Sequence, residues 1–169
     1  TTSAAADVTP PTISSYSPVD NATGVAVTSN LVATFSENVT AVATKTVSIR
    51  RSSDNSVFES YSLPHASVVV SGATVTINPT GSLASVTGYY VNTDVGAFED
   101  AAGNDFAGIA NNSTWNFTTV APIDVTPPTV TSLIPADNAA SVAVNSNFTL
   151  TFSENVIAGS GKLVQVVQV

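Results

Sequence analysis

The sequence predicts an all-β fold, an antiparallel β-sandwich followed by an incomplete second copy of the same module. Three observations predict it: a composition rich in strand-forming residues, short alternating segments between turns, and a long internal repeat. Val, Ile, Phe and Thr favour pleated strands, whereas Met is absent and Lys plus Arg number only 4. The hydrophobic content of 43% is sufficient for a packed core.

The internal repeat sets the expected domain boundaries. The segment Asp7–Lys45 returns as Asp124–Lys162 without a gap, and about three in five aligned positions are identical. A repeat of this length is a whole domain rather than one unit of a solenoid. We therefore expect a linker or mature N-terminus at 1–6, a complete domain at 7–122, and the first strands of a second domain at 123–169. Those first strands are too few to bury their own apolar side.

Alternation and turn residues indicate the strands of the first domain. In chain order they are 31–35, 45–51, 68–70, 74–77, 89–95 and 114–120. The two strands at 68–70 and 74–77 flank Gly72, and this spacing is typical of a tight hairpin. No segment shows the period of a helix. Short strands separated by turns in this way predict a sandwich.

Aromatic residues in the last two of these strands differ in their expected exposure. Trp115 and Phe117 lie two residues apart, so they share one face of their strand, which we expect to be the core face. Tyr89 and Tyr90 are adjacent, so their rings point to opposite faces of the sheet. We therefore expect Tyr90 to be exposed.

Five motifs resemble those of bacterial Ig-like domains. They are D-V-T-P-P-T at 7–12, P-V-D-N-A-T-G-V at 18–25, T-F-S-E-N-V at 34–39, E-D-A-A-G-N at 99–104 and W-N-F-T-T at 115–119. The resemblance implies an Ig-like antiparallel sandwich with Greek-key topology. It also implies tandem arrays, since such domains occur in bacterial surface adhesins, in S-layer-like proteins and as accessory modules of secreted enzymes. Leu83, Thr87 and Tyr89 are similar to the tyrosine corner, in which the Tyr hydroxyl ties a loop to the start of a strand.

Charge and cysteine content exclude several classes of function. The 12 acidic and 4 basic residues give a net charge of −8, which repels nucleic acid and anionic membrane surfaces. No apolar run approaches the roughly 20 residues of a membrane-spanning helix, so we expect no membrane insertion. Cysteine is absent. Together with an abundance of Thr, Ser, Ala and Asn, these features are typical of exported bacterial proteins, and we expect an extracellular or cell-surface location.

The sequence offers no recognisable catalytic constellation. His65 is the only histidine, and no acid stands at a spacing that marks a triad with it. A G-x-S-x-G motif, a metal-type pair of histidines and a glycine-rich phosphate loop are all missing from the sequence. We therefore expect a protein that is not an enzyme.

Acidic residues gather where calcium could bind. In an Ig-type strand order, the chain start, the loop after the 31–35 strand and the loop before the last strand meet at one pole. Calcium takes six to eight oxygen ligands, so calcium is the one cofactor expected. The candidate ligands are Asp7, Glu37, Asp100 and Asn104 at that pole, and Asp20, Asp124 and Glu154 at the junction with the second domain. The alternative is that Asp, Asn and Gly occupy these loops for turn geometry.

The C-terminal run is a strand former with no following partner. Its apolar residues form a candidate strand-pairing edge, namely Leu163, Val164, Val166, Val167 and Val169. An unpaired apolar edge invites another chain. Either strands are donated between subunits, or the sequence is cut at this point and the edge has no function.

Three functions agree with these features. The first is a structural spacer or stalk module of a bacterial extracellular or cell-surface repeat protein, with neighbouring repeats as its partners. The second is an adhesive or carbohydrate-binding accessory module that contacts a surface glycan. The third is a self-assembling fibre subunit, completed by strands that other copies of the chain donate.

Overall fold

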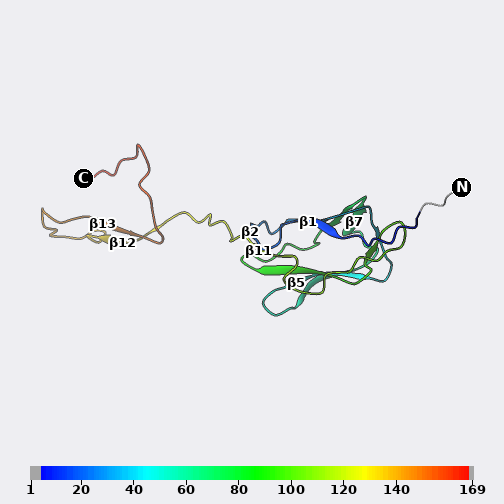
Figure 1. Cartoon of the computed structure of the whole chain (residues 1–169). Coiled ribbons are helices and arrows are strands. Elements are labelled where there is room, and N and C mark those ends of the chain that lie inside the picture. Colours follow the sequence, from blue (N-terminus) through cyan, green and yellow to red (C-terminus); the bar gives the residue numbers. More distant parts are fainter. Residues whose placement is uncertain (1–4, 168–169) are drawn as a thin grey trace. The chain divides into compact units, whose positions relative to one another are not determined.

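The computed structural model describes residues 5–167, and the chain divides into two units, Thr1–Pro122 and Ile123–Val169 (Figure 1). The described regular elements are all β-strands, so none of them is a helix that could cross a membrane. The strands of the first unit are β1 (Ile13–Ser17), β2 (Ala22–Val25), β3 (Leu31–Phe35), β4 (Thr40–Ala41), β5 (Thr46–Arg51), β6 (Val57–Ser62), β7 (Val68–Ser71), β8 (Thr74–Ile77), β9 (Gly88–Thr93), β10 (Phe98–Glu99) and β11 (Asn116–Thr119). The second unit contains β12 (Val130–Ile134) and β13 (Thr149–Phe152).

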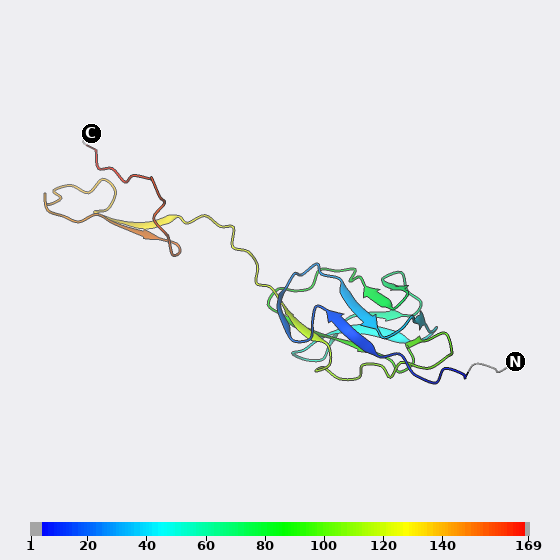
Figure 2. The same ribbon diagram turned by 45° about the horizontal axis from the view of Figure 1, so that its top comes forward.

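Two large sheets and one two-stranded sheet, β10-β4, form the first unit. One sheet has the order β1-β3-β8-β7 and the other has the order β2-β11-β9-β5-β6; Figure 2 shows β1, in blue, beside the light-blue strand β3. Neighbouring strands are mostly distant in sequence, as a Greek-key sandwich requires. The predicted β-sandwich is thus confirmed, with antiparallel strand pairs except for β2 and β11.

The first part of the chain contributes to both sheets. β1 pairs with β3 in one sheet, and after the turn at 18–21 β2 pairs with β11 in the other. The β2–β11 pair is parallel, and it is extended at both ends by backbone bonds. The amide of Asn21 donates to the Asn116 carbonyl at 2.8 Å, and the amide of Val120 donates to the Val25 carbonyl at 2.8 Å.

The core lies between the two sheets and follows from alternation along the strands. On β3, Leu31, Ala33 and Phe35 are buried, while the residues between them are half-buried. The ring of Phe35 packs edge-on against Phe98 and Phe106, with ring centroids 5.5 Å and 5.1 Å away. Apolar residues that alternate in this way bury one face of each sheet against the other.

Trp115 joins the two sheets at the point where the chain changes from one to the other. Its ring is 1% exposed and stacks on Tyr16 of β1, with ring centroids 4.9 Å apart. Its indole Nε1–H donates to the carbonyl of Pro18 at 2.9 Å. The prediction that Trp115 and Phe117 face the core is confirmed.

The two tyrosines of β9 differ in outcome. The backbone amide of Ala84 donates to the Tyr89 hydroxyl at 3.0 Å, which confirms the tyrosine corner. The prediction that Tyr90 is exposed is wrong, because its ring is only 4% exposed. The Tyr90 hydroxyl donates to Asn55 Oδ1 at 3.0 Å, and Asn55 belongs to the turn between β5 and β6. Alternation gives the face on which a residue lies, but a neighbouring turn can still cover that face.

Glu59 of β6 ties its strand to the loop after β8. Its carboxylate accepts hydrogen bonds from Thr80 N at 3.0 Å, Thr80 Oγ1 at 2.9 Å, Gly81 N at 2.8 Å and the Tyr61 hydroxyl. Burial raises the pKa of Glu59, but these four hydrogen bonds together hold that pKa below its ordinary value. The folded protein therefore favours the charged carboxylate.

Glu59→Gln should change the pH dependence of stability. A carboxyl with a lowered folded pKa contributes stability above its unfolded pKa of about 4.3 and loses it as the pH falls through the folded pKa. We expect the variant to be about 2 kcal/mol less stable at pH 7. We also expect its stability to fall less steeply than that of the wild type between about pH 5 and pH 2. Urea unfolding across this range measures both effects, with Ser60→Ala as the control; parallel pH profiles would contradict the prediction.

The second unit consists of a hairpin that copies β1 and β3. β12 pairs with β13 in the register Leu133↔Leu150 and Ile134↔Thr149, where the first unit has Tyr16↔Ala33 and Ser17↔Val32. Both pairs have a register shift at the same place, between Ile13 and Ser15 in β1 and between Val130 and Ser132 in β12. The two copies are therefore alike in structure as well as in sequence.

The predicted strand at the C-terminal end is not present in the described residues. Leu163, Val164, Val166 and Val167 are exposed but lie in no strand, and Val169 lies outside the described residues. A strand needs a ladder of hydrogen bonds to a neighbour, and no neighbouring strand reaches this segment. The strand-pairing role of these residues therefore stays a prediction.

Candidate metal centre

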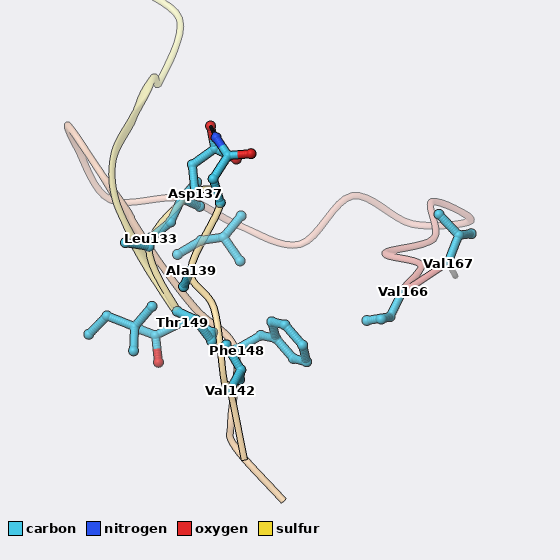
Figure 3. Close-up of a pocket in the computed structure, with 13 residues that line it drawn as sticks. Leu133, Asp137, Ala139, Val142, Phe148, Thr149, Val166 and Val167 are labelled. Atoms are coloured by element: carbon cyan, nitrogen blue, oxygen red, sulfur yellow. Dashed lines mark hydrogen bonds between the residues drawn. The ribbon is translucent and has the colours of Figure 1, made fainter. Parts of the chain in front are cut away.

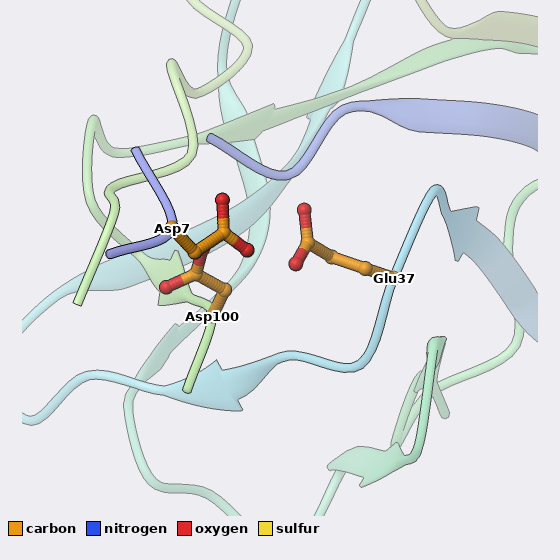
Figure 4. A group of neighbouring side chains, drawn as sticks. All are labelled: Asp7, Glu37 and Asp100. Carbon is orange, nitrogen blue, oxygen red and sulfur yellow. The ribbon is translucent and has the colours of Figure 1, made fainter. Parts of the chain in front are cut away.

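Three loops position the candidate site at one pole of the first unit. Asp7 precedes β1, Glu37 follows β3, and Asp100 follows β10. The short antiparallel pair of β4 and β10, with Thr40 opposite Glu99, draws the last two loops together. Carboxylate oxygens of Asp7, Glu37 and Asp100 lie within 4.8 Å of one another, and Figure 4 shows the three side chains converging.

Asp100 is the most rigidly held of the three. It is only 4% exposed. Its Oδ1 accepts from the amides of Ala102 and Asn104, each at 2.8 Å, and its Oδ2 accepts from Asn104 Nδ2 at 2.7 Å. The bond from the Asn104 side chain is the largest of the causes that lower the pKa of Asp100. Its charge is therefore fixed in place, and the turn geometry foreseen as the alternative is present at this residue.

Asp7 connects the chain start to this pole. Asn104 Nδ2 donates to the backbone carbonyl of Asp7 at 3.2 Å, and the Asp7 carboxylate accepts from the amide of Thr9 at 3.0 Å. Pro11, further along the same segment, is fully buried. The segment before β1 is thus fastened to the domain by the Asn104 side chain and by buried Pro11. Thr12 adds two bonds to Ser36: its carbonyl accepts from the Ser36 amide at 2.7 Å, and its amide donates to Ser36 Oγ at 3.1 Å.

Glu37 experiences the negative charge of the other two carboxylates. Burial raises its pKa, and the nearby charges of Asp100 and Asp7 raise it further. Three anionic groups that face one another at this distance repel, because like charges disfavour their ionised forms. A cation between them would remove that repulsion.

The donor set fits calcium better than a softer metal. Each carboxylate offers two hard oxygens, and each oxygen has two lone pairs, so the hydrogen bonds to Asp100 do not use up its capacity. Calcium takes carboxylate, carbonyl and water oxygens in flexible geometry, whereas zinc sites are built mainly from Cys and His. The three carboxylates supply oxygen alone.

The other predicted ligands have different surroundings. Asn104 lies at the same pole, where its amide donates to Asp100 and to Asp7. Asp20 lies at the opposite end of the first unit, where its Oδ1 accepts from the amide and the side chain of Asn116 at 3.0 Å and 2.9 Å. Asp20 therefore fixes the start of β11 in this structure.

Asp124 and Glu154 repeat part of the site in the second unit. Together with Thr126 and Ser153 they line one hollow, and Asp124 Oδ1 accepts from the amide of Thr126 at 2.9 Å, as Asp7 does from Thr9. Within residues 5–167 no third acidic residue joins this pair.

His65, the only histidine, takes part in a turn. Its Nδ1 accepts from the amide of Ser67 at 3.0 Å, and its ring contacts Tyr61, with centroids 5.0 Å apart. The side chain therefore has a local structural partner.

No pattern in the sequence indicates the contacts that assemble the pole. β4 and β10 have only two residues each, too few for alternation to reveal. The bond from Asn104 to the Asp7 carbonyl joins residues at opposite ends of the domain, and no local pattern marks it.

Comparison with known proteins gives a family match and two structural likenesses. The model of a family described as bacterial Ig-like domain matches residues 7–119 and again residues 124–169. The crystal structure of the S-layer protein rSbsC(31-844) is similar at 22% identity and a TM-score of 0.44, over 73% of this chain and 16% of that chain. The crystal structure of the N-terminal part of the bacterial S-layer protein SbsC is similar at 23% identity and a TM-score of 0.46, over 92% of this chain and 36% of that one. This chain therefore spans well under half of either structure, and the comparison with curated proteins finds no match.

Proposed function

Since this chain belongs to the family of bacterial Ig-like domains, we propose that it is a non-catalytic spacer module of a bacterial extracellular or cell-surface repeat protein. The observation that carries the proposal is the fastening of the chain start to the pole of the domain that follows it. Asn104 holds the Asp7 carbonyl, and Pro11 is buried against the domain. A segment held in this way transmits orientation from one repeat to the next.

The linkers are suited to the same task. Each copy opens with the same D-V-T-P-P-T segment, and its two prolines favour extended geometry and stiffen the chain. Tandem copies joined by such segments extend a protein rather than enclose a site. Partners of this module are then its neighbouring repeats.

Calcium is the second part of the proposal. A calcium ion held by Asp7, Glu37 and Asp100 would join the preceding segment to two loops of the domain and would neutralise the repulsion between the three carboxylates. The close approach of the three carboxylates supports it: burial is the main cause that raises the pKa of Glu37, and the charges of Asp100 and Asp7 raise it further. The linker would then be fixed by an ion as well as by Asn104.

Calcium should raise the melting temperature of the first unit. The order of stability of the wild type and Glu37→Gln should reverse between chelator and calcium. An ion that binds only the folded state stabilises it by about 2.7 kcal/mol at a hundred times its Kd. In excess chelator we expect Glu37→Gln to be more stable than the wild type, because one of three repelling charges is gone. In millimolar calcium we expect it to be less stable than the wild type, because one ligand is gone. Differential scanning calorimetry in both buffers measures the reversal.

Two further variants sharpen the calcium test. Asp7→Asn should behave as Glu37→Gln does, although Asp7 lies in the segment before the first strand. Asp54→Asn removes a charge from the turn between β5 and β6, far from the pole, and should respond to calcium as the wild type does. Equal melting temperatures of the wild type in calcium and in chelator would contradict calcium binding at this pole. The acidic residues would then serve the geometry of their turns alone.

The adhesive alternative has less support. Carbohydrate sites commonly use exposed aromatic rings, but Trp115, Phe117 and Tyr90 are all buried. We therefore favour neighbouring repeats over a surface glycan as the partners of this module.

A further inference from the structure

The two units differ in what lines their largest hollows. The hollow of the second unit has a volume of about 510 Å³ and is lined mainly by apolar residues, among them Leu133 and Phe148 (Figure 3). The equivalent residues of the first unit, Tyr16 and Leu31, pack against the core or belong to it. The hollow of the second unit is therefore part of the fold of the repeat, whereas the hollow of the first unit is polar and lies outside its core.

The polar hollow of the first unit is a groove on the outer face of its five-stranded sheet. Val47 and Ile49 of β5 face the core, so Thr46, Ser48 and Arg50 point to the opposite face. With residues of β6, β9 and two loops they line a groove with a volume of about 450 Å³. We call it the β5 groove. Its polar lining includes Thr46, Ser48, Arg50, Ser60, Asn92 and Asp94.

The floor and one wall of the β5 groove are held by hydrogen bonds. Ser48 lies between Ser60 and Asn92 in the sheet, because β5 pairs with both β6 and β9. The Asn92 side chain donates through Nδ2 to the carbonyls of Ile109 and Asn111 at 3.0 Å and 3.1 Å. These bonds fix the loop before β11 against the sheet. A ligand then does not have to order the wall, which lowers the entropic cost of binding.

Arg50 is the only cationic residue in the lining of the groove, and its guanidinium is only partly satisfied. Its Nη1 donates to the Asn55 carbonyl at 3.0 Å, whereas its Nε is buried and has no partner among the described residues. A carboxylate can accept two parallel hydrogen bonds from one side of a guanidinium. A ligand that draws Nε toward the groove would also satisfy a buried donor. The state of Arg50 therefore favours a carboxylate as the ligand, although the chain itself has 12 acidic residues.

The rest of the lining favours a ligand that also carries hydroxyl groups. Ser48 is only 7% exposed, and its hydroxyl makes no hydrogen bond within residues 5–167. Asp94 Oδ2 accepts from the amide of Thr46 at 2.7 Å, which leaves Oδ1 as a free acceptor among the described groups. A ligand hydroxyl both donates and accepts, so it can pair with the serine and with the aspartate. A plain anion would instead be repelled by Asp94.

We propose that the β5 groove binds a uronic acid, an acidic sugar residue whose carboxylate pairs with Arg50 and whose hydroxyls pair with Ser48 and Asp94. This inference goes beyond the spacer function and does not rest on it. Neighbouring repeats remain the partners in the array, and the sugar is an additional ligand. Recognition by charge and hydroxyl groups requires no exposed aromatic ring. An acidic peptide is less suited, because β5 is paired on both sides and offers no free backbone edge to a peptide main chain.

Amide NMR spectra of the full chain, titrated with methyl glucuronoside, test the proposal. We expect saturable shifts that are largest at Ser48, Ser60 and Asn92. Methyl glucoside has a similar ring without the charge, so it should bind about tenfold more weakly, because the charged hydrogen bonds to Arg50 are lost. Acetate has the charge without the ring and should also bind more weakly. Shifts that do not saturate at these residues would overturn the proposal. Equal affinity for acetate, or tighter binding of a glutamate-rich peptide, would overturn the sugar as the ligand.

Three variants test whether binding takes place in the groove. Arg50→Lys keeps the charge but loses the two-bond geometry, so we expect the affinity for methyl glucuronoside to fall about tenfold. Ser48→Ala removes a hydroxyl without a partner in the described chain, so it should fold normally and weaken binding about threefold to tenfold. Arg51→Lys is the matched control, because the Arg51 guanidinium lies over the Phe58 ring, 5.4 Å from its centroid, and does not line the groove. Wild-type affinity in both Arg50→Lys and Ser48→Ala would overturn the proposal, and circular dichroism checks that each variant is folded.

Discussion

Trp115→Ala should lower the free energy of unfolding of the first unit by about 3–5 kcal/mol, as large-to-small changes of buried aromatic residues do. The indole ring is 1% exposed and stacks on Tyr16, so alanine leaves a cavity between the two sheets. The change also removes the donor to the carbonyl of Pro18, at the point where the chain passes from one sheet to the other. Urea unfolding monitored by far-UV circular dichroism measures the loss.

Two controls show which part of Trp115 matters. Trp115→Phe keeps most of the buried ring but removes the Nε1 donor, so we expect a smaller loss of about 1–3 kcal/mol. Val19→Ala, next to Pro18 on the exposed side, should change stability by about 0.5 kcal/mol or less. A Trp115→Ala variant with the stability of Val19→Ala would contradict the role given to the ring.

Gly108→Ala should destabilise the first unit by about 2–5 kcal/mol through two separate costs. Gly108 has a φ of +78°, and a residue with a Cβ pays about 1–2 kcal/mol in that left-handed region. A Cβ there would also lie 2.8 Å from the Thr93 carbonyl oxygen and 2.8 Å from the Val95 amide nitrogen. These are backbone atoms, so relief requires the chain to shift, at about 1–3 kcal/mol more.

Gly24→Ala is the matched control for Gly108→Ala. Gly24 has a φ of +69°, but no atom lies within 4 Å of a Cβ built there. Only the conformational cost of about 1–2 kcal/mol applies. Equal losses in the two variants would show that the contact with Thr93 and Val95 contributes nothing.

The strands and the core could be predicted from the sequence because alternation is a local signal. The hairpin around Gly72 and the buried pair of Trp115 and Phe117 follow from the two-residue period alone. The burial of Tyr90 could not be predicted in this way, because it depends on Asn55 in a turn between two other strands. Likewise, the C-terminal segment has the composition of a strand, but strand formation also needs a partner that local sequence does not supply.

The candidate site could be predicted in part for a different reason. An Ig-type strand order places the chain start and two particular loops at one pole, so Asp7, Glu37 and Asp100 could be grouped before any coordinates. The sequence could not show that Asp100 would be almost wholly buried or that Asn104 would reach the Asp7 carbonyl. Both depend on how the loop after β10 turns back on itself, with the Gly103 amide donating to the Asp100 carbonyl at 3.3 Å.

The parallel pairing of β2 with β11 gives this repeat a direction of mechanical strength. When an array is stretched, force enters the domain ahead of β1 and leaves it after β11. Because β2 and β11 run in the same direction, this pull slides one strand along the other and loads all the hydrogen bonds between them at once. An antiparallel pair at the same place would open one bond at a time from its end. In the proposed spacer, the terminal strands would therefore resist tension along the chain.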